Sequence, residues 1–288
     1  CASAKRAFLM ADTSPSSQNN GPTGRPSRTA VAALIIAVAL SAGFLLLGPL
    51  RVGTVAADTS LFTDPQKRGI EQIVKEYLLQ NPQVLIEVQG ALEQKMAQEE
   101  ADRTKALVAE NAKEIYRHPD APVAGNPQGD ITVVEFFDYN CGYCKRGFHN
   151  IRELIEKDSN VRVVFKELPI LSKDSEEAAK IALAARAQGK YWELHQALIE
   201  SKGRVTEAFA LEAAGKLGLD VEKLKADKDS DAVKSELARV EALARKMNIS
   251  GTPHFLVGSE AIGGAPEDLL DQLSTKIAAL RQSGCAYC

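Results

Sequence analysis

The chain has 288 residues, of which 45% are hydrophobic and 25% charged. This is the composition of a globular protein with a substantial core, and it excludes disordered and fibrous classes. The formal net charge is −3 at pH 7, so we expect no nucleic-acid partner held by phosphate contacts. Five cysteines are too few for a disulfide scaffold of this size, but four of them form two C-x-x-C pairs, Cys141/Cys144 and Cys285/Cys288.

Residues 1–57 have the pattern of a targeting segment. A polar lead with Arg25 and Arg28 precedes an uncharged stretch at 30–50, which is longer than a usual signal-peptide core and approaches the length that spans a bilayer. The small residues at 55–57 suit a signal peptidase. A cleaved signal and a retained anchor both fit, and a buried core helix is the third alternative. Either of the first two predicts that the following residues are exported to the periplasm, where thiols can be oxidised.

Residues 58–118 are predicted to form a helical segment. Asp64-Pro65 and Asn81-Pro82 are both typical helix starts. Apolar residues then recur at helical spacing: Ile70, Ile73, Val74, Tyr77 and Leu78, and further on Leu85, Val88 and Leu92. A helix with so narrow an apolar stripe cannot form its own core, so it must pack on another copy or on the domain that follows. We favour self-association through residues 64–117, which predicts a homo-oligomer.

Residues 119–284 show the element order of an α/β domain. A stretch rich in Pro, Gly, Asn and Asp at 118–130 is predicted to be a linker. The elements expected after it are a strand at 131–137, a helix at 142–157, a strand at 161–167, a helical insertion at about 172–248, a strand at 254–257 and a helix from about 266. The first three form a right-handed βαβ unit with a parallel pair. Residues 285–288 are a cysteine-containing tail, for which a disulfide or a loose metal-binding pair is expected rather than a second active site.

The motif Cys141-Gly142-Tyr143-Cys144 follows a strand end and opens a helix. The first thiol then faces unpaired backbone N–H groups and the positive end of the helix dipole, which favour the nucleophilic thiolate. Cys144 lies one turn inward and can resolve a mixed disulfide by attacking Cys141. Half a zinc site and an inert bridge are the alternatives, but zinc needs two more ligands. We expect no metal and no cofactor.

Two further features fit a redox site. Glu135 interrupts an otherwise apolar strand six residues before Cys141. Burial would raise its pKa, so that it could exchange a proton with Cys144 through water, whereas a solvent-facing strand position is the alternative. Pro253 enters a later strand, a place where Pro costs a ladder hydrogen bond and is sometimes in cis. His254 follows it and could line a substrate groove.

Together the Cys-Gly-Tyr-Cys motif, the upstream Val-Val-Glu-Phe-Phe, the helical insertion and the late Gly-Thr-Pro-His-Phe resemble the DsbA-like thiol–disulfide oxidoreductases of the thioredoxin superfamily. The resemblance covers about 119–281 and implies an α/β thioredoxin-like fold with an inserted helical domain. It also implies that Pro253 is cis and packs on the active-site pair. Thr252 would then offer backbone hydrogen bonds to an extended substrate. The segment at 64–117 is similar to the N-terminal oligomerisation helices of the suppressor-of-copper-sensitivity C proteins.

The dipeptide between the cysteines bears on the direction of the reaction. Gly142 and Tyr143 bring no cation to the sulfur, and Gly-Tyr is, by family likeness, the dipeptide of the dimeric bacterial disulfide isomerases. We therefore expect an isomerase that shuffles disulfides in exported proteins and is kept reduced by a membrane thiol–disulfide partner. The substrate is expected to contact Gly142, Tyr143, Thr252, Pro253 and His254. A dithiol oxidase of the same fold is the main alternative, and a chaperone or metal-binding module is an alternative from another class.

Overall fold

The computed structural model describes residues 61–287 and divides into two units, with the boundary between Leu79 and Gln80. The expected signal or anchor at 30–50 lies outside the described residues. In the first unit the described structure is essentially helix α2 (Asp64–Gln80), none of whose residues is buried. None of the helices in residues 61–287 has the length and apolar character needed to cross a membrane.

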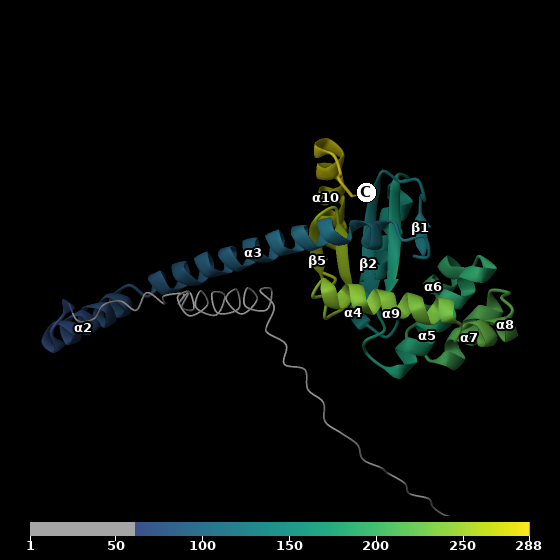
Figure 1. Cartoon of the computed structure of the whole chain (residues 1–288), viewed down its shortest axis with the longest axis horizontal. Coiled ribbons are helices and arrows are strands. Elements are labelled where there is room, and N and C mark those ends of the chain that lie inside the picture. Colours follow the sequence, from purple (N-terminus) through teal and green to yellow (C-terminus); the bar gives the residue numbers. More distant parts are fainter. Residues whose placement is uncertain (1–60, 288) are drawn as a thin grey trace, which may run out of the picture. The chain divides into compact units, whose positions relative to one another are not determined.

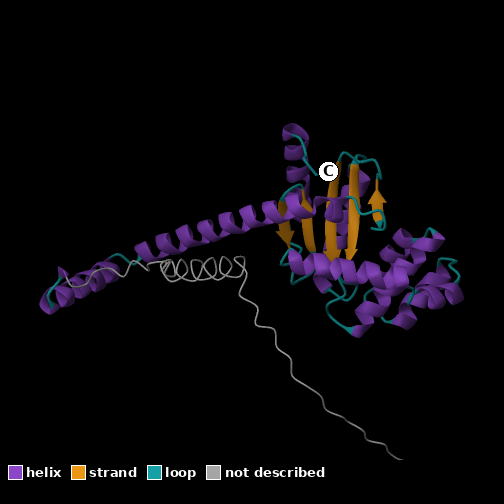
Figure 2. Cartoon of the chain, viewed as in Figure 1, coloured by secondary structure: helices purple, strands orange, loops and turns teal. Residues whose placement is uncertain are grey.

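The second unit is built on a five-stranded mixed sheet with the strand order β1-β3-β2-β4-β5 (Figures 1 and 2). The strands are β1 (Val123–Gly125), β2 (Ile131–Phe137), β3 (Val161–Glu167), β4 (His254–Val257) and β5 (Glu260–Gly263). Strands β2 and β3 are parallel, and the other neighbours are antiparallel. The predicted spans of β2, β3 and β4 are confirmed residue for residue. Strand β1 is a difference, because it lies in the stretch predicted to be a linker.

Helices cover both faces of this sheet. On one face, α4 (Gly142–Lys157) and α10 (Leu269–Ser283) pack together, with α4 over β3 and β1 and α10 over β2 and β4. Ile131, Val133 and Phe137 of β2 point into that layer. On the other face, Val134 and Phe136 pack against α9 (Asp231–Lys246) and the end of α3 (Gln83–Tyr116). This three-layer arrangement is the thioredoxin-like fold expected from the sequence, and it leaves the carboxyl end of β2 to position the cysteine pair.

The helical insertion is cut into short helices by side-chain caps. Helices α5 (Lys173–Ala185), α6 (Tyr191–Ile199), α7 (Glu207–Lys216) and α8 (Val221–Asp227) form it, with a 3-10 turn at Arg186–Gln188. Four N-cap side chains accept the backbone N–H three residues on: Ser172, Thr206, Asp220 and Ser230. Gly189 and Gly218 end helical stretches with positive φ, where a side chain would be strained. The last of these caps starts α9, which leaves the insertion and returns to the sheet.

Only the end of α3 belongs to the core of the second unit. Its buried residues are Val108, Ile115 and Tyr116. Two cations of β3 satisfy its last carbonyls: Arg162 donates to Tyr116 O at 2.6 Å and Lys166 Nζ to Glu114 O at 2.8 Å. Burial lowers the pKa of Lys166 to about 8. The final turns of α3 are thus fixed to the sheet, while the earlier turns are exposed.

Candidate active site

The cysteine pair sits where β2 gives way to α4. After Phe137 the chain makes a short loop, and the N–H of Cys141 bonds to Asp138 O at 3.0 Å. Cys141 is the N-cap of α4 with extended backbone (φ −78°, ψ 116°), so its side chain lies beside the unpaired N–H groups of the first turn. Both thiols are free; Cys141 is 6% exposed and Cys144 is fully buried. The sequence-predicted helix start is confirmed, and only the first sulfur approaches the surface.

The environment of Cys141 favours its thiolate. Its pKa is lowered to about 5, first by a hydrogen bond from the Cys144 thiol, although burial opposes the shift. Bonds from Thr252 and from the N–H groups of Cys144 and Tyr143 act in the same direction. As a thiol, Cys141 Sγ donates to Thr252 O at 3.1 Å, which favours the neutral form. Among the described residues, the buried Thr252 Oγ1 has no partner, so this hydroxyl can turn to donate once the thiolate forms.

Cys144 is placed in the opposite environment. Burial raises its pKa well above the usual range, and the hydrogen bond it gives to Cys141 and the charge of Glu135 raise it further. The predicted burial of Glu135 is confirmed: it lies between Phe165 and Phe255 in the sheet and is 2% exposed. Its pKa is raised to about 8, mainly by burial and then by Cys141. A carboxyl with this pKa can take the proton that Cys144 must lose before it attacks.

The loop before β4 packs against the first sulfur. The peptide bond between Thr252 and Pro253 is cis, as the resemblance implies, and Pro253 is buried. Pro253 O is occupied by the N–H of Gly264 at 2.8 Å, whereas Thr252 O faces Cys141 Sγ. A Cβ placed on Gly142 would meet no heavy atom within 4 Å. The structure therefore brings Cys141, Thr252 and Pro253 together beside an open surface.

Other residues named from the sequence are placed differently. His254 lies on the second face of the sheet, edge-on to Phe136 with ring centroids 6.5 Å apart, so the structure does not bring it to the thiols. Tyr143 is 58% exposed and stacks under the Arg146 guanidinium at 4.3 Å. The ammonium of Lys145 is bound to Ser201 and Gly203. The two cations that follow the motif thus have other partners than the Cys141 sulfur.

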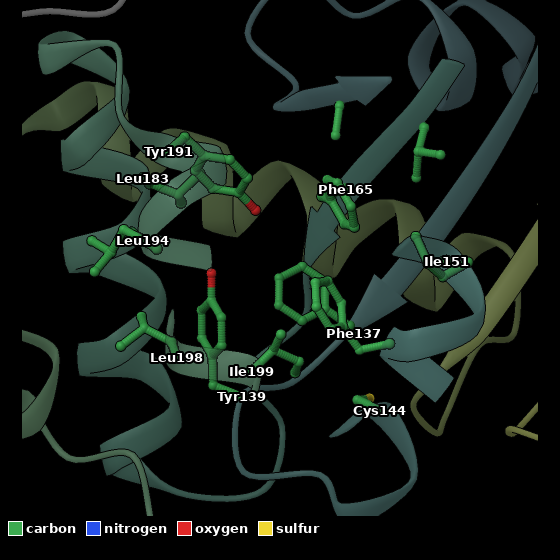
Figure 3. Close-up of a cluster of buried hydrophobic side chains, with 14 of the residues drawn as sticks. Phe137, Tyr139, Cys144, Ile151, Phe165, Leu183, Tyr191, Leu194, Leu198 and Ile199 are labelled. Carbon is green, nitrogen blue, oxygen red and sulfur yellow. The ribbon is translucent and has the colours of Figure 1, made fainter. Parts of the chain in front are cut away.

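A buried polar cluster beside the cysteines was missed from the sequence. Tyr139 and Tyr191 both donate to Glu167 Oε1, at 3.1 and 2.9 Å; Figure 3 shows their hydroxyls directed towards one region, with Cys144 below Phe137. His195 Nδ1 lies 3.1 Å from the Tyr139 hydroxyl, and burial lowers its pKa to about 3. The available signal was the polar Asp-Tyr-Asn triplet between a buried strand and Cys141.

The sequence predicts a disulfide or a loose metal-binding pair for the cysteines of the tail. Cys285 is disulfide-bonded, whereas Cys288 lies outside the described part. Within residues 61–287, no group of three or more His, Cys, Asp or Glu side chains is placed to hold a metal ion.

Comparison with known families matches two parts of the chain. Residues 132–278 match the DSBA-like thioredoxin domain, and residues 66–99 match the copper resistance protein ScsC N-terminal domain. The first match covers just over half of the chain and includes both cysteines, Glu135 and Pro253.

Known proteins with similar sequences include an antiporter and a disulfide bond formation protein. The chain is 31% identical over 145 residues to Na(+)/H(+) antiporter NhaA 1 of Salinispora arenicola, covering 50% of this chain and 22% of that protein. It is 30% identical over 158 residues to disulfide bond formation protein D of Bacillus subtilis, covering 49% and 69% respectively. The chain thus spans about a fifth of the length of the antiporter it matches.

Two solved structures are similar over most of their length. A thioredoxin-like oxidoreductase from Silicibacter pomeroyi shares 43% identity at a TM-score of 0.57, covering 59% of this chain and 97% of that one. Proteus mirabilis ScsC in a transitional conformation shares 26% identity at a TM-score of 0.57, covering 77% and 100%. With its helix-opening dithiol and cis proline in place, the chain belongs to the family of DSBA-like thioredoxin domains, preceded by a segment of the ScsC N-terminal type.

Proposed function

We propose that this protein is an exported, oligomeric thiol–disulfide oxidoreductase that shuffles disulfides in other exported proteins. The observation that carries the chemistry is the contrast between two thiols one helical turn apart, because Cys141 has its pKa lowered to about 5 while burial raises that of Cys144. Only Cys141 is a thiolate at neutral pH, and thiolates are the nucleophiles of disulfide exchange.

The reaction starts when Cys141 Sγ attacks one sulfur of a substrate disulfide. A Cys141–substrate disulfide forms and the other substrate sulfur leaves as a thiolate. If a substrate thiolate later attacks the mixed disulfide, the substrate acquires a new pairing and Cys141 is released unchanged, with no net electron transfer. This sequence of steps is isomerisation.

Cys144 provides the escape from a stalled mixed disulfide. Its proton passes to ionised Glu135, and its sulfur then attacks Cys141 Sγ, which expels the substrate as a thiolate. The products are a reduced substrate and a Cys141–Cys144 disulfide. Two electrons from a dithiol partner, which we propose to be a membrane protein, must then reduce that disulfide before Cys141 can act again.

The N-terminal helices support the oligomeric part of the proposal. Large apolar side chains are exposed along α2 and along the first half of α3: Ile70, Ile73, Val74, Tyr77 and Leu79, and then Leu85, Ile86, Val88, Leu92 and Met96. Exposed apolar rows of this kind mark interaction surfaces in soluble proteins. The match of residues 66–99 to the ScsC N-terminal domain points to the same segment. Several catalytic domains held in one assembly would suit a misfolded client with more than one wrong disulfide.

A smaller apolar surface beside the thiols suits unfolded clients. Within the described part of the catalytic domain, the exposed large apolar side chains are Tyr143, Ile170 and Leu171. The N–H of Leu171 bonds to Asp138 Oδ2 at 3.0 Å, which ties that loop to the residues just before Cys141. The surface accordingly offers apolar contacts next to the attacking sulfur without selecting one sequence.

A dithiol oxidase is the second candidate function, and the same low pKa supports it. A stabilised Cys141 thiolate stabilises the reduced enzyme and makes its disulfide a stronger oxidant. In that case a membrane partner would withdraw electrons from the pair instead of supplying them.

Recovery of activity from a scrambled multi-disulfide substrate tests the choice. We expect recovery by the mature chain, its loss in Cys141→Ser, and a strong reduction in Ile73→Glu. Deleting the whole helical segment is a poorer control, because Val108, Ile115 and Tyr116 belong to the catalytic core. Rapid oxidation of a reduced substrate without recovery would favour the oxidase. The absence of both activities would contradict both enzyme assignments.

A further inference from the structure

One loop of the helical insertion contacts the chain on both sides of the dithiol motif. This loop, residues 201–205, joins α6 to α7. Before the motif, Asn140 Oδ1 accepts the N–H of Val205 at 2.8 Å, and Asn140 Nδ2 donates to Val205 O at 3.0 Å. Nδ2 also donates to Ser175 Oγ of α5 at 3.2 Å. The residue next to Cys141 is therefore fixed to the insertion through three hydrogen bonds.

Lys145 makes the matching contacts after the motif. Its ammonium donates to Ser201 O and Ser201 Oγ, both at 2.9 Å, and to Gly203 O at 2.6 Å. The backbone N–H of the same residue bonds to Cys141 O at 3.1 Å. The loop itself is held at its other side, because Val205 is fully buried and Arg204 pairs with Asp174 of α5. The Asn140 amide before the motif and the Lys145 ammonium after it thus both bind loop 201–205.

The position of the Cys141 sulfur is what such contacts can control. The thiolate depends on donors from the first turn of α4 and from Thr252, and hydrogen bonds weaken steeply when distance and angle change. We propose that loop 201–205 positions the Cys141 sulfur, acting through Asn140 and Lys145, so that the helical insertion is part of the redox site. Asn140 and Lys145 are positioning residues, since neither side chain is bound to the sulfur. The inference rests on the proposed role of Cys141 as the attacking thiol.

The test is the acidity of Cys141 in Asn140→Ala. This substitution removes three hydrogen bonds without changing any charge, so a looser sulfur should show a higher pKa. We expect the pKa of Cys141 to rise by about one unit from about 5. The thiolate absorbance in the ultraviolet measures this pKa. Alkylation of Cys141 should then slow about fivefold at pH 5 and stay unchanged at pH 8, because only the thiolate fraction differs. A merely structural role would not move this ratio.

Two variants keep the test decisive. Asn126→Ala is the matched control, since Asn126 also bridges two chain segments, to Ser159 O at 3.0 Å and from Gln128 N at 2.9 Å, but far along the chain from the motif. It should leave the Cys141 pKa unchanged. Ser175→Ala removes one of the three bonds and should raise the pKa by a smaller amount, which also decides the matter if Asn140→Ala fails to fold. An unchanged pKa in Ser175→Ala and in any folded Asn140→Ala would overturn the proposal.

Lys145 needs a variant that keeps its charge, because loss of a nearby cation would by itself raise the pKa of a thiol. Lys145→Arg retains the charge, but a planar guanidinium cannot sit among three oxygens as an ammonium does. We expect a rise in the Cys141 pKa that is the same at low and high salt. A rise that disappears in 1 M salt would indicate charge alone and would remove Lys145 from the proposal. None of these measurements needs a disulfide substrate, so failure of the isomerase assignment would be seen separately.

Discussion

The N-terminal helices and the catalytic domain differ in which side chains they expose and which they bury. In α2 no residue is buried, and Ile73 is 67% exposed. In the catalytic domain, every residue of β2 and β3 is buried, including the ionisable Glu135, Arg162 and Lys166. One region exposes what a folded protein normally hides, and the other hides groups that normally face water. The first arrangement is expected of a surface that another copy covers, and the second of a site that needs altered acidity.

Helix α3 contains both situations in one element. Its first half exposes Leu85 and Leu92, whereas its last turns place Val108, Ile115 and Tyr116 in the core. Apolar residues at helical spacing occur in both halves, although residues 97–106 between them include no large apolar side chain, so periodicity alone does not say what covers a stripe. The difference arises because the last turns alone meet the sheet. If the two regions have separate tasks, assembly and chemistry should respond to different substitutions.

The largest expected effect is on chemistry alone. Replacing Cys141 by Ser removes the thiolate, and a Ser hydroxyl is not ionised at neutral pH, so disulfide exchange should fall by at least about 1,000-fold. The oligomeric mass should not change, because Cys141 lies in the catalytic domain. Turnover of a scrambled substrate and sedimentation measure the two properties on one sample. A change of mass in this variant would contradict the separation of tasks.

Glu135→Gln should slow the escape step and remove a pH dependence. Because Glu135 has a pKa of about 8, it becomes a proton acceptor as the pH rises through 8, and resolution by Cys144 should accelerate over that range. The variant should resolve a preformed mixed disulfide about 100-fold more slowly at pH 8.5, with no rise between pH 7 and 9. Glu167→Gln is the control, because the buried Glu167 carboxyl is bonded to Tyr139 and Tyr191 instead. This variant should leave resolution unaltered.

Glu135→Gln should also change how the free energy of unfolding depends on pH. Glu135 has a folded-state pKa above its ordinary value of 4.5, so between about pH 4.5 and 8 the folded protein holds a proton that the unfolded chain has lost. Stability from neutral Glu135 is complete below that range and is lost as the pH rises towards 8, by on the order of 4 kcal/mol. Urea unfolding should show Glu135→Gln gaining stability relative to the wild type from pH 5 to pH 8. A constant difference would mean that the carboxyl is not neutral when buried.

Ile73→Glu should weaken assembly without altering the Cys141 thiolate. Burial of an Ile side chain contributes about 2 kcal/mol, so placing a carboxylate there should weaken association roughly 30-fold for each helix. The thiolate pKa of Cys141 should stay the same, while recovery of a scrambled substrate should decline with the mass. Gln72→Glu adds the same charge at the neighbouring exposed position and should preserve the oligomer. An unaltered mass in Ile73→Glu would show that the stripe of α2 is not the interface.

Local pattern was enough to predict the elements that carry the cysteines. Strands β2, β3 and β4 follow from short runs rich in β-branched and aromatic residues, and helix α4 follows from its apolar face. The burial of Glu135 follows from its place inside such a run. Strand β1 was not predictable, because three residues with Pro122 before and Gly125 within them have no strand signal of their own; pairing with β3 makes them a strand.

Contacts between distant segments account for the rest. The bond of Asn140 to Val205 joins residues 65 apart, and no spacing in the sequence indicates it. His254 was expected at the substrate groove because it follows Pro253, but alternation along β4 gives the thiol face to Phe255 and the other face to His254. Without the end of α3 on this face of the sheet, Arg162 and Lys166 would be exposed to solvent. They are buried here because the carbonyls at the end of α3 accept hydrogen bonds from them.

The smallest expected effect locates the boundary between the two regions within α3. Tyr116 donates its hydroxyl to Gly258 O at 2.6 Å, in a buried setting at the end of β4. Tyr116→Phe should therefore lower the free energy of unfolding of the catalytic domain by about 1 kcal/mol, by loss of that bond and desolvation of the carbonyl. Tyr143→Phe is the control, since this exposed hydroxyl should contribute less than about 0.5 kcal/mol. Equal unfolding free energies for Tyr116→Phe and the wild type would place the end of α3 with the assembly helices, whereas the predicted loss with unchanged mass assigns it to the catalytic domain.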